Sequence, residues 1–287
     1  MLSLLLACTG AVDDDQNPNG GDDTGADVET TLAPEPAPYD GDCPDISGDF
    51  TIETSAGQSR DLKVVLPDNP EGAPVVFAWH PLGGTASYAI SAFGLDDLAA
   101  EGWVVIAPET ASGSDKPAFE WGFVGDPDMG AADLAVFDDT LSCLYQQHNI
   151  DLDRVYASGF SAGGMMTAYL ALNRSQHLAA IAPYSGGTGA ILDYETPEHT
   201  LPTLLVWGGS SDIWNGVVNF HDAATDFSER LQDDGHFVIE CDHGGGHTVS
   251  PSVSGWTADF FLDHPYGTVD TYADGLPDSF PSYCEIP

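Results

Sequence analysis

The chain has 287 residues, 42% of them hydrophobic, which suits one large α/β domain with a substantial core. Six Lys and Arg residues stand against 46 Asp and Glu residues, so the formal net charge is -40. A surface of this sign repels nucleic acid and anionic lipid headgroups, and we therefore expect no nucleic-acid partner.

The first eight residues resemble the signal of a bacterial lipoprotein. They end in Leu5-Leu6-Ala7-Cys8 and are too few to span a bilayer, and the basic residues that usually begin such a signal are missing. We expect Cys8 to carry lipid and to provide the chain's only membrane contact. The alternative is an ordinary start followed by a soluble chain.

Residues 9–42 have the composition of a linker. They contain ten acids, no Lys or Arg, and frequent Gly, Pro, Thr and Asn, and such a stretch buries too little apolar surface to fold. We therefore predict a disordered acidic linker over residues 9–42 and a folded domain over residues 43–287.

Four cysteines remain inside that domain, at positions 43, 143, 241 and 284. An even number in an exported chain favours two disulfides and an extracytoplasmic location, whereas four free buried thiols would suit the cytoplasm. Three pairings are possible. We favour Cys43 with Cys143 and Cys241 with Cys284, because the second bond would tie down the C-terminal tail.

The domain begins with two antiparallel strands within residues 49–66 and continues with alternating apolar runs and helical segments. Such alternation is typical of the α/β class, with a mostly parallel central sheet covered by helices on both faces. The expected buried strands are 74–79, 103–108, 154–158, 178–184, 203–207 and 236–241. The expected helices include 133–148, 162–175, 219–234 and 255–264.

The sequence Gly159-Phe160-Ser161-Ala162-Gly163 lies where a strand is expected to turn sharply into a helix. That turn would expose the Ser161 hydroxyl at the carboxyl edge of the sheet. A serine nucleophile also needs an acid and a base. Asp212 and His247 each follow a predicted strand, in the order Ser, Asp, His that belongs to α/β-hydrolases. His243 is the rival base, and ordinary turn roles are the alternative for each residue.

The developing oxyanion would need backbone donors near Ser161. We expect the amides of Ala162 and Leu82 to supply them, with Gly83 as the second choice in place of Leu82. Pro81 cannot donate, because it has no amide hydrogen.

Two tryptophans in predicted loops, Trp121 and Trp214, are candidates for substrate binding, although aromatic residues near strand ends are as often part of the core. Residues 270–278 are only faintly similar to a calcium loop, since Tyr272 stands where an acid is expected. We therefore predict no metal and no cofactor.

The segments 133–139, 150–166 and 179–183 resemble the extracellular polyhydroxybutyrate depolymerase and feruloyl esterase family of α/β-hydrolases. The resemblance extends over residues 50–264 and implies a secreted or tethered serine esterase with Ser161, Asp212 and His247 as its triad. It also implies an ester substrate, possibly polymeric, and we expect a monomer. One departure is His80-Pro81, where the family commonly has His-Gly.

Acetylxylan esterases contain similar domains, so the resemblance leaves the ester open. Two other functions fit the same residues. One is a peptidase or amidase on the same scaffold, and the other is a non-catalytic surface lipoprotein that binds polysaccharide through its aromatic residues.

Overall fold

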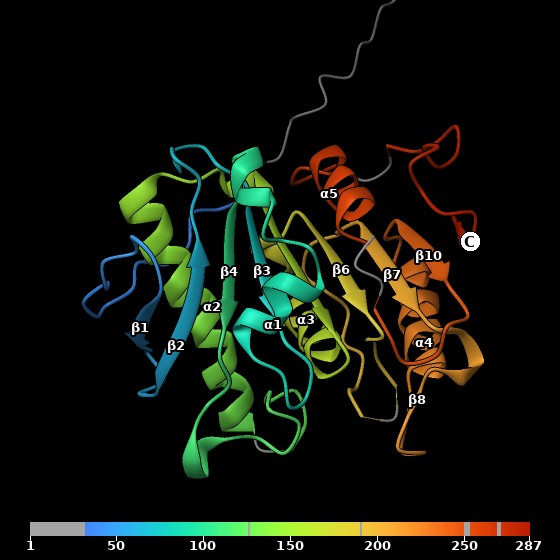
Figure 1. Ribbon diagram of the computed structural model, residues 1–287, viewed down its shortest axis with the longest axis horizontal. Helices are drawn as coiled ribbons and strands as arrows, with labels where there is room; N and C mark the ends of the chain where they lie inside the picture. The colour runs from blue at the N-terminus through green and yellow to red at the C-terminus, as the bar shows by residue number, and fades with distance from the viewer. Residues whose placement is uncertain (1–31, 126, 190, 250–252, 269–270) are drawn as a thin grey trace, which may run out of the picture. The chain divides into compact units, whose positions relative to one another are not determined.

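The computed structural model describes residues 32–125, 127–189, 191–249, 253–268 and 271–287. Within these ranges the chain forms a nine-stranded sheet in the order β1-β2-β4-β3-β5-β6-β7-β10-β11, and a two-stranded ribbon of β8 and β9 (Figure 1). The strands are β1 (Phe50–Glu53), β2 (Ser59–Val65), β3 (Val75–Trp79), β4 (Val104–Pro108), β5 (Val155–Phe160), β6 (Ala180–Tyr184), β7 (Thr203–Trp207), β8 (Ile213–Trp214), β9 (Val218–Asn219), β10 (Val238–Asp242) and β11 (Cys284–Glu285).

The centre of the sheet is parallel and its edges are antiparallel. Strands β4, β3, β5, β6, β7 and β10 run in one direction, whereas β2 opposes both β1 and β4, and β11 opposes β10. Every residue of β3, β4, β5, β6 and β7 is buried, as expected for strands covered on both faces. The predicted antiparallel start and parallel centre are confirmed.

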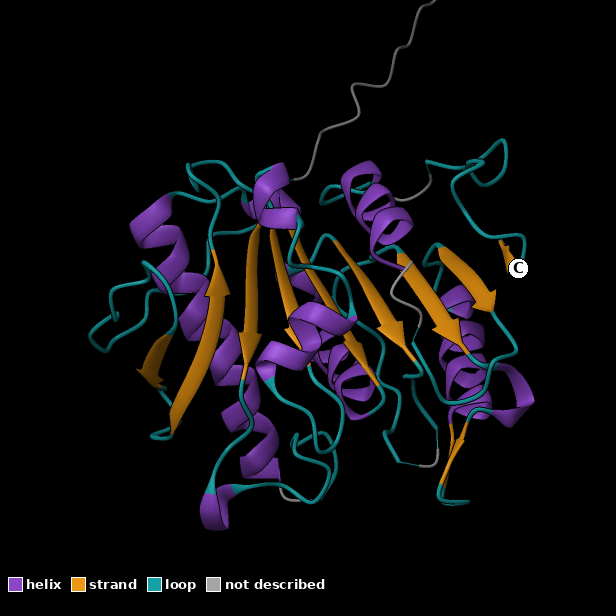
Figure 2. Ribbon diagram, viewed as in Figure 1, coloured by secondary structure: helices purple, strands orange, loops and turns teal. Residues whose placement is uncertain are grey.

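Helices cover both faces of this sheet (Figure 2). Side chains alternate along β3, so that Phe77 belongs to the core cluster that includes residues of α2, α3 and α4, while Val76 belongs to the one that includes residues of α1 and α5. The predicted α/β class is therefore confirmed. The helices are α1 (Ala86–Ala92), α2 (Pro127–His148), α3 (Ala162–Arg174), α4 (Phe220–Asp233) and α5 (Val253–Asp263). None of those in the described ranges has the length and apolar character needed to cross a bilayer.

Both favoured disulfides are present. Cys43 pairs with Cys143 on α2, and Cys241 on β10 pairs with Cys284 on β11. The second bond lies within a short strand pair, which the sequence analysis did not predict. The C-terminal tail is thus joined to the sheet by backbone hydrogen bonds as well as by a covalent bond.

The described part of the expected linker packs on the domain. The Ala33 amide donates to Asp153 Oδ1 at 2.7 Å, the Tyr39 amide donates to Ser142 Oγ at 3.0 Å, and Pro36 is buried. The contacts therefore begin ten residues earlier than the predicted boundary at Cys43, because an extended Pro-rich chain finds acceptors on the domain surface. Cys8 and the rest of the predicted linker lie outside the described residues.

A buried ion pair holds the long segment between β4 and α2. Arg60 on β2 pairs with Asp133 on α2 at 3.1 Å, and the second Asp133 oxygen accepts the Gly122 amide at 2.6 Å. Burial raises the pKa of the Asp133 carboxyl, against the opposing effects of the Gly122 amide and Arg60. The segment that contains Gly122 is consequently fixed over the carboxyl end of β3 rather than left in solvent.

Candidate active site

Ser161 occupies the sharp turn between β5 and α3. Its backbone angles, φ 60° and ψ -119°, are unusual for a residue other than glycine, and its amide donates to the Tyr184 carbonyl at 2.9 Å. A Cβ at Gly163 would lie 1.9 Å from the Trp79 carbonyl oxygen, and one at Gly159 would lie 2.3 Å from the Gly163 oxygen. Both glycines are therefore required by close backbone approach.

His247 joins the serine to an aspartate. Its Nε2 lies 2.9 Å from Ser161 Oγ and its Nδ1 lies 2.7 Å from Asp212 Oδ1. The carboxylate can only accept, so Nδ1 carries the proton and Nε2 accepts from the serine hydroxyl. The structure thus brings together the three side chains that the sequence analysis singled out at three different strand ends.

Asp212 is completely buried and has two further partners. Its Oδ2 accepts hydrogen bonds from Ser185 Oγ at 2.7 Å and from the Gly208 amide at 2.8 Å. Burial opposes ionisation, but the hydrogen bonds from His247, Gly208 and Ser185 hold the pKa of Asp212 below its usual value. The sequence analysis missed Ser185, although its place directly after β6 could have indicated it.

The imidazole of His247 lies between two aromatic rings. The Phe160 ring centroid is 4.8 Å away and the Phe220 centroid is 4.5 Å away, both nearly parallel to it. These contacts limit rotation of the ring and shield it from solvent. The rival base His243 lies elsewhere, where its Nδ1 accepts the Gly245 amide and its ring faces Tyr283.

The two expected amide donors belong to segments on either side of Ser161. Ala162 begins α3, and Leu82 lies in a turn after β3 that is closed by a hydrogen bond from the Gly84 amide to the Pro81 carbonyl. Both side chains line a cavity together with Ser161. Gly83, the second choice, donates its amide to Glu120 Oε2 at 3.0 Å.

The structure separates the two candidate tryptophans. Trp214 on β8 lines the cavity at Ser161 and packs edge-on against Phe119. Trp121 is 0% exposed, and its indole N–H donates to the His80 carbonyl at 2.9 Å. The prediction that Trp121 contacts substrate is therefore wrong for this structure, because its loop folds back over the end of β3 and places the ring in the core.

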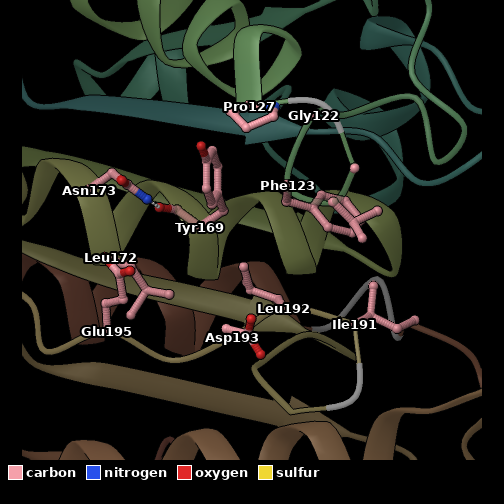
Figure 3. Close-up of a pocket in the computed structure, with 12 residues that line it drawn as sticks. Gly122, Phe123, Pro127, Tyr169, Leu172, Asn173, Ile191, Leu192, Asp193 and Glu195 are labelled. Carbon is pink, nitrogen blue, oxygen red and sulfur yellow. Dashed lines mark hydrogen bonds between the residues drawn. The ribbon is translucent and has the colours of Figure 1, made fainter.

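The cavity at Ser161 is apolar and small, with a volume of about 20 Å³. A larger pocket of about 410 Å³ adjoins it and shares Phe123 and Ile191 with it (Figure 3). Figure 3 shows polar side chains on two sides of this larger pocket, from α3 and from the segment after β6. They are Tyr169, Asn173, Asp193 and Glu195.

No group of three or more His, Cys, Asp and Glu side chains in the described part of the chain is arranged to hold a metal ion. Asp270, the first residue of the segment compared above with a calcium loop, lies outside the described residues. Tyr272 itself donates its hydroxyl to Asp263 at 2.9 Å.

Comparisons with known proteins agree with this fold. The prolyl oligopeptidase family profile matches residues 91–225, which include Ser161 and Asp212. The solved structure described as native sOPH superimposes with a TM-score of 0.68 at 20% identity, covering 88% of this chain and 98% of the other. The chain is therefore an α/β-hydrolase in fold.

Three curated proteins are similar to this chain in sequence. A bifunctional acetylxylan esterase/xylanase of Neocallimastix patriciarum is 29% identical over 58% of this chain and 23% of its own length. Poly(3-hydroxyalkanoate) depolymerase C of Paucimonas lemoignei is 26% identical over 61% and 49%. Feruloyl esterase B of Thermothelomyces thermophilus is 33% identical over 47% and 48%.

The chain thus spans half or less of the length of these relatives. They nevertheless confirm the resemblance found in the serine segment. Within the α/β-hydrolase fold, this chain is therefore similar in sequence to a poly(3-hydroxyalkanoate) depolymerase and to a feruloyl esterase.

Proposed function

We propose that this chain is a serine esterase that hydrolyses carboxylic esters through an acyl-enzyme. One observation carries the proposal: Asp212, His247 and Ser161 form a continuous hydrogen-bonded relay, with distances of 2.7 Å and 2.9 Å. The strained serine turn and the apolar cavity beside it support the same conclusion.

In the first half-reaction Ser161 Oγ attacks the ester carbonyl carbon while His247 Nε2 takes the hydroxyl proton. Ionised Asp212 holds the imidazole in the required tautomer and stabilises its charged form. The amides of Ala162 and Leu82 donate to the oxyanion of the tetrahedral intermediate. The ester C–O bond then breaks, and the alcohol leaves with the proton from His247.

In the second half-reaction a water molecule takes the place of the alcohol. His247 accepts one of its protons as the water oxygen bonds to the acyl carbon. The bond between that carbon and Ser161 Oγ breaks, the carboxylic acid leaves, and His247 returns the proton to the serine. The free enzyme is restored without any external cofactor.

The cavity sizes support a short acyl group. A volume of about 20 Å³ beside Ser161 holds little more than one water-sized group, so it suits acetyl better than feruloyl. The larger pocket of Figure 3 would hold the rest of the substrate, and among the described residues its lining contains Asp193 and Glu195 but no basic side chain. We therefore expect a neutral alcohol part, such as a sugar unit or a hydroxyalkanoate chain, in preference to an anionic one.

The location proposed for the enzyme is extracytoplasmic, either secreted or held at the cell envelope by lipid on Cys8. Two disulfides support exposure to an oxidising compartment. Mass spectrometry of the mature N-terminus tests the anchor, and an unmodified Cys8 in the native host would remove it from the proposal.

Hydrolysis of p-nitrophenyl acetate, butyrate and ferulate tests the activity, and a fluorophosphonate probe followed by peptide mass spectrometry locates the nucleophile. We expect turnover that declines from acetate to ferulate and label on Ser161. Ser161→Ala should lose the label and about 10⁶-fold in kcat. Ser158→Ala is the control, because Ser158 lies in the strand that precedes Ser161 but outside the relay, and it should keep both label and turnover. Absence of both turnover and label would contradict the proposal and would favour a non-catalytic polysaccharide-binding protein.

A second candidate is a peptidase or amidase, which the match to the prolyl oligopeptidase family favours. The same relay serves both reactions, so the leaving group decides between them. Parallel assays with a p-nitrophenyl ester and the matching p-nitroanilide compare them directly. Faster turnover of the anilide would replace the esterase assignment.

A further inference from the structure

The turn that follows β3 has a defined peptide orientation. Gly84 donates to the Pro81 carbonyl at 2.8 Å, Gly83 has φ +75°, and Leu82 is not among the residues with positive φ. These are the features of a type II β-turn, in which the central peptide is reversed relative to type I. The direction of the Gly83 N–H therefore reports which of the two turns the chain has adopted.

A buried carboxylate accepts that N–H. Glu120 Oε2 lies 3.0 Å from the Gly83 nitrogen, and Glu120 Oε1 pairs with Lys116 Nζ at 2.6 Å. The Glu120 side chain is only 6% exposed, whereas that of Lys116 is 42% exposed. Reversal of the central peptide would turn the Leu82 carbonyl toward this acceptor oxygen and break the hydrogen bond from Gly83, so the glutamate favours the type II form.

The backbone at Glu120 is itself unusual. Its φ is 70°, in the left-handed region that glycine normally occupies, and its carbonyl accepts a hydrogen bond from Thr110 Oγ1. A charged residue with a long side chain at such a position indicates that the side chain has a function there. The next residue, Trp121, holds the His80 carbonyl at the start of the same turn.

We propose that Glu120 is a positioning residue for the oxyanion turn, which holds the Leu82 amide beside Ser161 by accepting the Gly83 N–H. This inference rests on the proposed esterase function. It also accounts for the departure at His80-Pro81, where the proline removes one amide and leaves Leu82 as the donor that must be oriented.

The test separates the reach of the side chain from its charge. Glu120→Gln keeps an oxygen acceptor at the same distance without the charge, whereas Glu120→Asp keeps the charge but withdraws the carboxylate by one methylene. We expect kcat of the Gln variant to stay within about threefold of wild type and that of the Asp variant to fall about 30-fold, less than the ~10²–10³-fold loss of a whole oxyanion donor. KM should change by less than about twofold in both.

A merely structural role is distinguished by inhibitor binding. A trifluoromethyl ketone, which forms a tetrahedral adduct with the serine, should bind the Asp variant more weakly in proportion to the loss of kcat/KM. The uncharged product alcohol should bind it as well as it binds wild type. Glu109→Gln is the matched control, because Glu109 accepts the Ala86 amide of the same connection but does not contact the turn at Gly83.

Two results would overturn the inference while wild type hydrolyses esters. One is an Asp variant as active as wild type, and the other is a Gln variant that loses more activity than the Asp variant, since charge rather than reach would then matter. Inactive wild-type protein without label on Ser161 would overturn the proposed function and this inference together. Circular dichroism and thermal melting of each variant establish that the kinetics refer to folded protein.

Discussion

The two sides of Ser161 are held in place by different means. On the His247 side each partner lies in a loop that follows a strand of the parallel sheet: Ser185 directly follows β6, whereas Asp212 and His247 lie five residues past the ends of β7 and β10. On the opposite side the turn after β3 is held by side chains of an irregular segment, through Glu120 and Trp121.

The difference shows how geometry is specified at each place. Strand ends are set by backbone ladders, so the distances between them vary little with side-chain identity. The irregular segment depends instead on single contacts, including the buried pair of Arg60 and Asp133 that anchors it. We expect substitutions on the first side to abolish chemistry outright and substitutions on the second side to produce graded effects.

The largest effect on the strand-end side is expected for Asp212→Asn. The amide would favour the wrong imidazole tautomer, and kcat should fall about 10⁴-fold while the fold is retained. Steady-state kinetics with p-nitrophenyl acetate measure it. Asp233→Asn makes the same change at an exposed acid of α4 and should leave kcat unaltered. Near-normal activity of Asp212→Asn would assign the acid to another residue.

Ser185→Ala should have an intermediate effect. It removes one of the two other hydrogen bonds to Asp212, and about 1.5 kcal/mol for a bond to a charged group corresponds to a loss of about tenfold in kcat/KM. The exposed Ser211, which does not contact the carboxylate, provides the control as Ser211→Ala. Equal kinetics for the two variants would mean that the Gly208 amide alone orients Asp212.

Trp214→Ala should act on binding. Loss of an aromatic contact worth about 1 kcal/mol should raise KM about fivefold for substrates that fill the cavity, with kcat nearly unchanged. Comparison of acetate and butyrate esters measures the dependence on acyl length. An unchanged KM for both esters would remove Trp214 from the binding surface.

Trp121→Phe should act on stability and leave KM unchanged. The substitution leaves the His80 carbonyl without its indole donor inside the core, which should lower the free energy of unfolding by about 1–2 kcal/mol. Urea denaturation measures this change. A raised KM at wild-type stability would instead restore a substrate contact for this ring.

The smallest effect concerns acid stability. The folded-state pKa of Asp212 is depressed, so its contribution to stability is present above the unfolded value of about 4 and is lost as pH falls through the lower folded value. Wild type should therefore lose more free energy of unfolding than Asp212→Asn between about pH 5 and pH 2. Parallel denaturation curves for the two proteins would contradict the assigned shift.

Much of this arrangement is predictable from local sequence. The apolar runs predicted the buried parallel strands, because a strand covered on both faces has apolar side chains at almost every position. Once those strands were placed, their ends indicated which serine, aspartate and histidine would lie together. Contacts such as that of Glu120 with Gly83 join residues 37 positions apart within irregular segments, and no periodic pattern marks them.

The sequence by itself determined the α/β class and the order Ser161, Asp212, His247, since these depend on patterns along the chain, whereas it left three disulfide pairings open. Only the tertiary structure decided that Trp121 is a core residue and that residues 33–39 pack on the domain. The same holds for two hydrogen bonds, from Ser185 to Asp212 and from the Gly83 amide to Glu120. The physical reason is that burial and hydrogen bonding between distant segments are settled by how loops fold back over strand ends. Local preferences carry no information about that step.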